Sequence, residues 1–503
     1  MCAALSSCLS PDEAQRVPAE QFLREAERSP GFCTLLLQVA INEGAGGALQ
    51  QLAVLAAKNV IGRCWVKGRD PRAPYLAEDE KAALKGAVVQ AVCSGSLADG
   101  LALQLSLIVA KISRSDFPRL WPELLPALAA GLSSSQPTVL RHTLRTLHYV
   151  LKEQTSKRLM RDRLDFMRGV VPQLIGPCAQ LWHMHAQPAV AAAARVGRAE
   201  LAEPPPPIVL SQLLDKCALR LLCHGYKPGE LNPTVSPEAA GLLGPMISKA
   251  TALYEHGCSG SGSGAQDGNG GGVAAVAVAP SLRTLLRGFC RLHEAQPKVF
   301  LLPSAELGGT TCARGGGSGG EGAETLLTIV LQLALRVLSD DASSAAGGGE
   351  GEADGLGAQH SQNGVPPRTL ATALRFIALV LHRLGKASNT VEELAAQRAA
   401  IGATLTGETA AALINLIVVQ HVALSVGILE EWSDNPEGQM IEEAAVGARL
   451  PDTSEEHDPR AWGLCTLLAL SMHYADVALP TLGAGLLAAV QTTPTTAKYA
   501  LQC

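Results

Sequence analysis

Apolar residues recur at steps of three and four along most of this chain. The clearest stretches lie at 101–112, 140–151, 164–174 and 210–221, and the same spacing returns at 370–384. This spacing places the apolar side chains on one face of a helix, so each stretch predicts an amphipathic α-helix with one buried side. No stretch alternates convincingly between apolar and polar residues as a half-buried strand does. The pattern predicts an all-α protein.

The helices follow one another in pairs from Ser10 to about Tyr226. Ser10, Pro11 and Glu13 predict a helix start, because they supply a capping hydroxyl, a first-turn proline and a glutamate that returns the capping bond. Paired helices with a period of roughly forty residues are typical of HEAT-type repeats. One pair cannot cover its own apolar face, so the repeats must stack. We therefore expect an α-solenoid superhelix of HEAT-type helical hairpins, with an ordinary helical bundle as the alternative.

Gly- and Ser-rich stretches interrupt this array and predict flexible insertions. They lie within 257–280, 303–324 and 340–367. Four prolines at 204–207 predict a stiff connector that no helix crosses. The last residues before Cys503 are apolar and lack the polar capping repeat that a solenoid needs at a free end, so we expect a truncated sequence.

The composition excludes several classes of protein. The net charge is −5, so we expect no nucleic acid as main partner. The 13 cysteines are an odd, irregularly spaced set and predict free thiols in a reducing compartment. The best membrane-spanning stretch, 411–429, contains Asn415, Gln420 and His421, which favours a buried helix and no membrane insertion. We expect a soluble protein of the cytoplasm or nucleus.

Catalytic chemistry has no convincing motif in this chain. Gly316, Ser318 and Gly320 match the nucleophile-elbow spacing, but no strand precedes them to present the serine. His183 and His185 lie two residues apart, which directs them to different sides of a helix and argues against a shared metal. We therefore predict no enzyme, no catalytic or metal-binding residues and no cofactor.

Two segments carry a resemblance to a known family. Residues 50–65 read QQLAVLAAKNVIGRCW, an alanine-rich helix running into Lys-Asn and then a tryptophan. Residues 106–128 read SLIVAKISRSDFPRLWPELLPAL, with Ala-Lys-Ile, Asp-x-Pro and Trp-Pro-Glu-Leu in order. In this order and spacing they resemble the second and third repeats of the importin-β (karyopherin) superfamily. The stretches 147–163 and 430–444 are similar to the importin-11 branch, and the resemblance is dense over 10–186.

The resemblance implies the N-terminal half of a nuclear import receptor, since the chain has about half the family's usual length. Such a receptor binds protein cargo in the cytoplasm, releases it when the small GTPase Ran binds in its GTP form in the nucleus, contacts Phe-Gly nucleoporins and shuttles through the nuclear pore. An exportin of the same superfamily and a HEAT-repeat scaffold without Ran dependence are the alternatives. The implied domains are an importin-β N-terminal, Ran-binding type domain at 10–70, HEAT-like repeats at 71–256 and further repeats at 281–503.

In the family, the inner helices of the N-terminal repeats bind Ran, so charged residues near helix ends are the first candidates for partner contacts. In the first segment these are Lys58, Asn59, Arg63 and Trp65. Packing is the stronger interpretation for Trp65. Asn59 is unfavourable inside a helix, which indicates either a cap for the next turn or a partner contact.

The second segment adds Lys111, Arg114 and Asp116. These residues end a strongly apolar helix, where cations also complement the helix dipole.

An acidic run supplies the remaining candidates. A solvated loop is the ordinary interpretation, and the alternative is an acidic loop that meets a basic surface on Ran or cargo with salt-sensitive affinity. The residues are Glu430, Glu431, Asp434, Glu437, Glu442 and Glu443.

Overall fold

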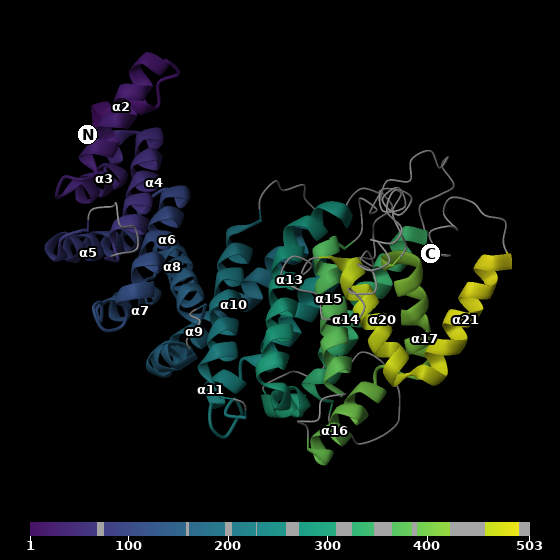
Figure 1. Cartoon of the computed structure of the whole chain (residues 1–503). Coiled ribbons are helices and arrows are strands. Elements are labelled where there is room, and N and C mark those ends of the chain that lie inside the picture. Colours follow the sequence, from purple (N-terminus) through teal and green to yellow (C-terminus); the bar gives the residue numbers. More distant parts are fainter. Residues whose placement is uncertain are drawn as a thin grey trace. The chain divides into compact units, whose positions relative to one another are not determined.

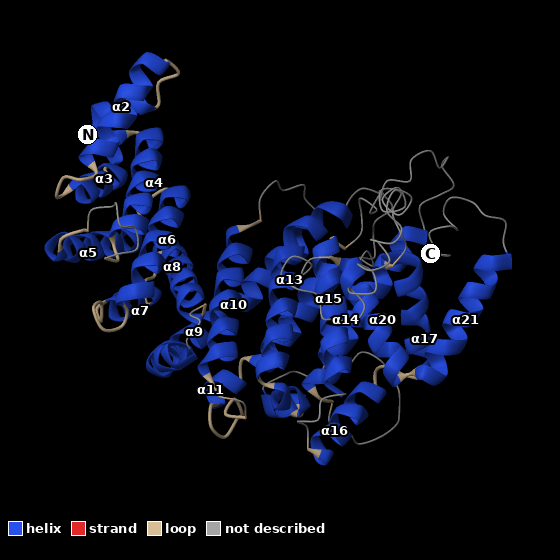
Figure 2. Ribbon diagram, viewed as in Figure 1, coloured by secondary structure: helices blue, strands red, loops and turns tan. Residues whose placement is uncertain are grey.

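A computed structural model describes residues 1–67, 75–156, 160–196, 204–227, 229–257, 271–307, 324–346, 365–384, 390–422 and 458–491. The described residues are almost entirely helical, and their only extended pairing is an isolated bridge between Pro303 and Thr325 (Figure 2). The chain divides into two compact units. Unit 1 comprises residues 1–181 and 216–225, and unit 2 comprises residues 182–215 and 226–503. The predicted all-α architecture is confirmed.

Unit 1 begins with short helices and continues as helical pairs (Figure 1). Its elements are α1 (Cys2–Cys8), α2 (Glu13–Ala26), α3 (Phe32–Ile41), η1 (Glu43–Ala45), α4 (Gly47–Cys64), α5 (Glu78–Ser94), α6 (Asp99–Asp116), α7 (Leu124–Leu132), α8 (Pro137–Thr155), and parts of α9 (Met160–Val196) and α10 (Pro206–Gly225).

The helices of unit 1 form two layers. Helix α4 packs on α6 and α6 on α8, whereas α3 packs on α5 and α5 on α7. Contacts of α3 with α4, α5 with α6 and α7 with α8 join the layers. The stripe Leu101, Leu105, Ile108 and Ile112 of α6 is buried between them. Each helix thus covers its apolar face only by stacking on its neighbours, as the repeat pattern predicts.

Unit 2 repeats this arrangement. Its elements are the remaining parts of α9 and α10, then α11 (Pro237–Ala240), α12 (Leu243–Gly257), α13 (Gly271–Ala295), η2 (Pro297–Leu301), η3 (Ser304–Leu307), α14 (Leu326–Ala346), α15 (Pro367–Leu384), α16 (Val391–Gly402), α17 (Gly407–Leu416), the π-helical turn η4 (Ile417–His421), α20 (Pro459–His473) and α21 (Ala475–Gln491). Helices α13, α15 and α20 pack in succession, and α12 and α14 pack beside them.

A buried ion pair joins three helices of unit 2. The Asp215 carboxylate, on α10, is fully buried and accepts the indole N–H of Trp182, on α9, at 2.7 Å. Lys249, on α12, places its Nζ 2.6 Å from Asp215 Oδ2 and 5.4 Å from the centre of the Trp182 ring. Ser211 Oγ accepts a further hydrogen bond from this ammonium group. Both charges are therefore compensated inside the core.

Three local predictions need correction. Helix α2 begins at Glu13 with Asp12 as its cap, because the Asp12 carboxylate accepts the N–H of Ala14 at 3.0 Å, whereas Ser10 Oγ only accepts the N–H of Asp12. Helix α10 begins inside the proline run, with Pro206 and Pro207 in its first turn, where no N–H donor is required. Helix α13 begins at Gly271 and α14 continues to Ala346, so both enter predicted insertions.

A long-range cap fixes the start of α3. Gly31 precedes this helix with φ of 80° and has no side chain that could cap the first turn. Glu80 of α5 supplies one. Its carboxylate accepts the N–H of Gly31 at 3.0 Å and the N–H and hydroxyl of Thr34 at 3.2 and 3.3 Å. The two helices of one layer are thereby held in register.

Glu80→Ala should lower the free energy of unfolding by about 1–2 kcal/mol, because two helix N–H groups lose a charged acceptor. Glu80→Gln retains one acceptor oxygen and should lower it by less. Thermal unfolding followed by circular dichroism measures both, with Asp79→Ala, an exposed carboxylate one position away, as the control. Equal midpoints for Glu80→Ala and Asp79→Ala would exclude the cap.

Candidate functional site

Helix α4 positions the first four candidates. Its small and branched side chains, among them Ala53, Ala57 and Ile61, are buried, so the polar residues between them emerge on other faces. Lys58 is half-buried and donates to Gln104 Oε1 of α6 at 2.8 Å. Asn59 is exposed in the middle of the helix, so it does not cap the next turn.

Arg63 forms an ion pair with Glu27. Its guanidinium lies 2.7 Å from Glu27 Oε2, just beyond the end of α2, and also donates to Oε1. The Arg63 side chain is 47% exposed, so this pair contributes little to stability. About half of the Arg63 side-chain surface is thus exposed to solvent.

Trp65 and Asp116 lie together in the core of unit 1. Trp65 is 4% exposed, and its indole N–H donates to Asp116 Oδ1 at 2.9 Å. Lys85 of α5 places its Nζ 2.6 Å from Asp116 Oδ2, and Ser115 Oγ donates to Oδ1 at 2.9 Å. Residues from α4, α5 and α6 thus share one carboxylate, which gives Trp65 and Asp116 a positioning role.

The surroundings of Asp116 act on its pKa in opposite directions. Burial alone would raise the pKa of this carboxyl group, but hydrogen bonds from Lys85, Trp65 and Ser115 and the Lys85 charge outweigh burial, and the pKa lies below its ordinary value. Asp116 is therefore ionised at neutral pH. Lys85 and Lys81 also lie 5.8 and 5.5 Å from the centre of the Trp65 ring, so the indole contacts cations as well as the carboxylate.

Lys111 and Arg114 project from α6 near its C-terminus. A side chain at Gly62 of α4 would collide with the Lys111 ammonium group, so the glycine leaves space for this cation between the helices. Arg114 Nη1 lies 2.8 Å from Glu153 Oε2 and donates to Ser156 Oγ at 2.7 Å, which directs it toward α8. The Arg114 side chain is 43% exposed.

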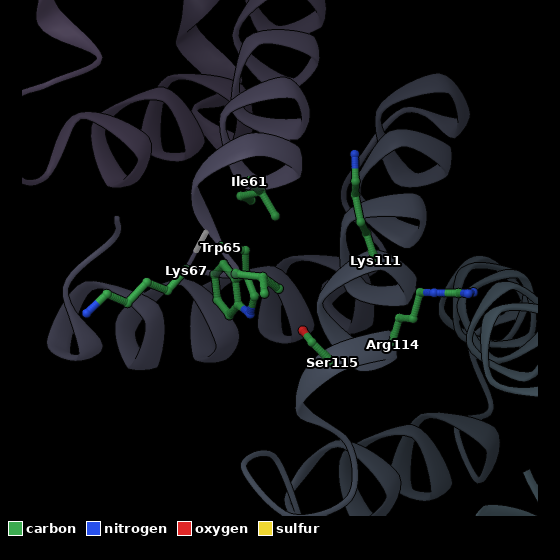
Figure 3. Close-up of a pocket in the computed structure, with 7 residues that line it drawn as sticks. Ile61, Trp65, Lys67, Lys111, Arg114 and Ser115 are labelled. Carbon is green, nitrogen blue, oxygen red and sulfur yellow. The ribbon is translucent and has the colours of Figure 1, made fainter. Parts of the chain in front are cut away.

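Three of the candidates, Trp65, Lys111 and Arg114, line a cleft of about 510 Å³, which we call the α4–α6 cleft. Figure 3 shows Trp65 between Lys67 on one side and the helix carrying Lys111 and Arg114 on the other. Among the described residues that line the cleft there is no carboxylate, although Asp116 accepts the indole N–H of Trp65. An apolar floor with cations at its rim suits a segment that carries both apolar and acidic groups. The lining residues are Ile61, Trp65, Val66, Lys67, Lys111, Arg114 and Ser115.

Sequence reasoning missed Lys85, Lys67 and Glu27, which complete this site. Lys85 and Glu27 come from other helices, and no local motif distinguishes them from surface charges. The acidic candidates Glu430, Glu431, Asp434, Glu437, Glu442 and Glu443 lie outside the described residues.

Two further observations concern the described residues alone. They contain no group of three or more His, Cys, Asp or Glu side chains placed to hold a metal ion. No single described helix is long and apolar enough to cross a membrane, although Val391–Gly402 and Gly407–His421, bent by 71°, together meet the length and composition criteria.

Comparison with known proteins identifies the family. Residues 19–94, which include part of α2 and all of α3, α4 and α5, match the Importin-beta N-terminal domain. A segment of 182 residues is 32% identical to Importin-11 of Mus musculus and of Homo sapiens, and 149 residues are 31% identical to human Exportin-2. Residues 19–94 are thus an importin-β N-terminal domain, and the matches to both receptors support a member of the importin-β superfamily. The aligned segments cover 36% and 29% of this chain, but only 18% and 15% of Importin-11 and Exportin-2.

Solved structures of the superfamily share the fold. Lph2, described as a bidirectional nuclear transport receptor of S. cerevisiae, aligns over 99% of this chain and 43% of its own, with 18% identity and a TM-score of 0.63. The exportin Cse1 in its cargo-free state aligns over 97% of this chain and 43% of its own, with 14% identity and a TM-score of 0.60. The predicted α-solenoid of HEAT-type repeats is confirmed.

Asp116→Asn should destabilise this importin-β-type chain by about 3 kcal/mol at neutral pH, because Lys85 loses its partner in a buried site. The folded-state pKa of Asp116 is lowered, so its stabilisation is complete above the unfolded-state pKa of about 3.9 and is lost as the pH falls through the folded-state pKa. The difference in unfolding midpoint between wild type and variant should therefore shrink below about pH 4. Asp79→Asn is the control, and a difference independent of pH would contradict an ionised Asp116.

Proposed function

We propose that this chain is part of a nuclear transport receptor that binds Ran in its GTP form and a protein cargo. The observation that carries the proposal is the match of residues 19–94 to the Importin-beta N-terminal domain, on a helical-repeat fold shared with transport receptors. Under the proposal the chain shuttles between cytoplasm and nucleus and contacts Phe-Gly nucleoporins. It acts by binding and not by catalysis.

For the direction of transport we propose import. The segment similar to Importin-11 is longer than that similar to Exportin-2, at 182 against 149 residues. Import requires Ran-GTP and cargo to bind antagonistically, so that each weakens the affinity for the other by the same factor. Export requires the opposite sign, and a scaffold without Ran dependence would show no coupling.

The α4–α6 cleft is the proposed partner-binding surface of unit 1. Stacked helices hold its side chains on rigid rods, and the Trp65–Asp116–Lys85 linkage fixes the spacing of three of those helices. The exposed candidates Asn59, Arg63 and Arg114 and the rim cation Lys111 are the proposed contacts. A surface of this kind binds through many dispersed polar groups, with no deep pocket.

The first prediction from this proposal concerns nucleotide state. The purified chain should bind Ran loaded with a non-hydrolysable GTP analogue at least about tenfold more tightly than Ran loaded with GDP, because the resemblance to the family implies binding of the GTP form. Isothermal titration calorimetry measures both affinities. Proteins captured by the immobilised chain from extract should then be released by Ran-GTP. Release supports import, capture that requires Ran-GTP supports export, and equal affinity for both nucleotide forms of Ran contradicts the proposal.

A second prediction concerns which layer of unit 1 binds Ran-GTP. Lys111→Gln with Arg114→Gln removes two cations at the α4–α6 cleft and should weaken Ran-GTP binding about tenfold, with a smaller salt dependence. Gln38→Ala with Asp79→Asn changes exposed positions on α3 and α5, in the opposite layer, and should leave the affinity unchanged. If Gln38→Ala with Asp79→Asn weakens Ran-GTP binding and Lys111→Gln with Arg114→Gln does not, Ran binds the α3–α5–α7 layer. Far-ultraviolet circular dichroism checks that both variants fold.

A further inference from the structure

Helices α13 and α15 of unit 2 carry many positive charges and little negative charge. Together they contain six arginines and a single carboxylate, Glu294. Glu294 lies at the C-terminal end of α13, and its Oε1 is 3.5 Å from Nη2 of Arg375 on α15. This carboxylate is therefore already paired, and neither helix supplies another to the arginines that lie closer to the N-terminal ends.

Two contacts fix the register of α13 and α15, which pack directly on each other. Cys290 Sγ donates to the carbonyl oxygen of Thr372 at 3.8 Å, across an offset of 82 residues. The pair of Glu294 with Arg375 spans 81 residues. Because both partners advance together along the chain, the helices run parallel, and the offset assigns each position of α13 to a level on α15.

At this offset three arginines lie close to one level. Arg368 of α15 is level with Arg287 of α13, and Arg283 lies one helical turn before Arg287 on the same face of α13. We call Arg283, Arg287 and Arg368 the arginine cluster. Arg368 is exposed and Arg283 is half-buried. Within the described residues, neither Arg283 nor Arg368 forms an ion pair with a carboxylate.

The arginine cluster holds like charges close together. Burial lowers the pKa of the Arg283 guanidinium below its ordinary value, and the charges of Arg368 and Arg287 add to the decrease. An arginine nevertheless keeps its proton in proteins, so deprotonation cannot relieve this repulsion. The neighbouring α10 contributes a neutral side chain, because Gln212 donates to Thr284 Oγ1 at 3.3 Å. An anion supplied from outside the chain would therefore relieve the repulsion.

We propose that the arginine cluster docks an acidic segment of a partner protein. A carboxylate accepts two parallel N–H bonds from one guanidinium group, so arginines on α13 and α15 can hold successive acidic side chains. The observations favour a protein segment over nucleic acid, because the cluster spans only about one helical turn and the net charge of −5 opposes broad phosphate contacts. The cluster lies within unit 2, whereas the α4–α6 cleft belongs to unit 1. The proposal does not depend on Ran or on the direction of transport.

The test uses the full chain and a fluorescein-labelled oligoglutamate peptide, with binding followed by fluorescence anisotropy. Arg368→Gln should weaken binding about fivefold and reduce its salt dependence, because one bidentate partner of the carboxylates is lost. Arg283→Gln, at the half-buried position, should weaken binding at least as much. Arg398→Gln removes the same charge from an exposed position on α16, in the same unit, and should leave binding unchanged.

Thermal unfolding without peptide distinguishes a binding role of Arg368 from a structural one. Removing an arginine that stabilises the fold through an ion pair lowers the unfolding midpoint. Arg368 instead lies beside like charges, so Arg368→Gln should unfold at the same temperature as wild type or at a higher one, although it binds the peptide more weakly. A midpoint for Arg368→Gln below that of Arg398→Gln would contradict the proposal, since Arg368 would then be compensated within the chain.

Two binding results would also overturn the proposal. Equal affinities of Arg368→Gln and Arg398→Gln for the peptide would show that only net charge matters. A single-stranded oligouridylate of the same charge that binds more tightly than the peptide, with the same loss in Arg368→Gln, would assign the cluster to nucleic acid. Because neither readout involves Ran, loss of Ran-GTP binding and loss of peptide binding can be distinguished.

Discussion

A buried carboxylate shared by an indole and an ammonium group fixes neighbouring helices in both units. In unit 1, Asp116 binds Trp65 and Lys85, and in unit 2, Asp215 binds Trp182 and Lys249. Each set comes from three helices, and each lysine lies within 6 Å of the centre of its tryptophan ring. The apolar stripes alone would allow helices to slide, since leucines and alanines pack in several registers. The hydrogen bonds and ion pairs to the buried carboxylates are directional, so they favour a single register.

Such linkages contribute more to geometry than to net stability. Desolvating two charges costs nearly as much as their attraction returns, and a well-packed apolar replacement is often as stable. Removing one partner strongly lowers the free energy of unfolding, however, because the other charge remains buried without compensation. The long-range cap of Glu80 on α3 acts in the same way, since the carboxylate of one helix satisfies the backbone of another. Register within the stack is therefore specified by polar groups placed at few points.

Because the helices are held in register, the charged side chains on their surfaces have fixed spacings. The chain is acidic overall, yet the helices α4, α6, α8 and α10 of unit 1 carry cations at defined spacing. The α4–α6 cleft joins cations to an apolar floor. A helical-repeat fold can hold such a surface because each repeat presents its own side chains on the same framework.

Apolar periodicity and the segments around Lys58 and Trp121 are local features, so the helices, their pairing and the resemblance to the importin-β superfamily could be predicted from the sequence. It also indicated packing for Trp65. The contacts of Trp65 and Lys85 with Asp116, and of Arg63 with Glu27, could be recognised only once the helices were placed in space. The start of α2 after Asp12 likewise depended on which local acceptor prevailed, whereas α10 begins within the proline run because its first turn requires no N–H donor. The physical reason is that periodicity encodes which face of a helix is buried, whereas the partner of a polar group is set by residues from other helices that stacking brings within hydrogen-bonding distance.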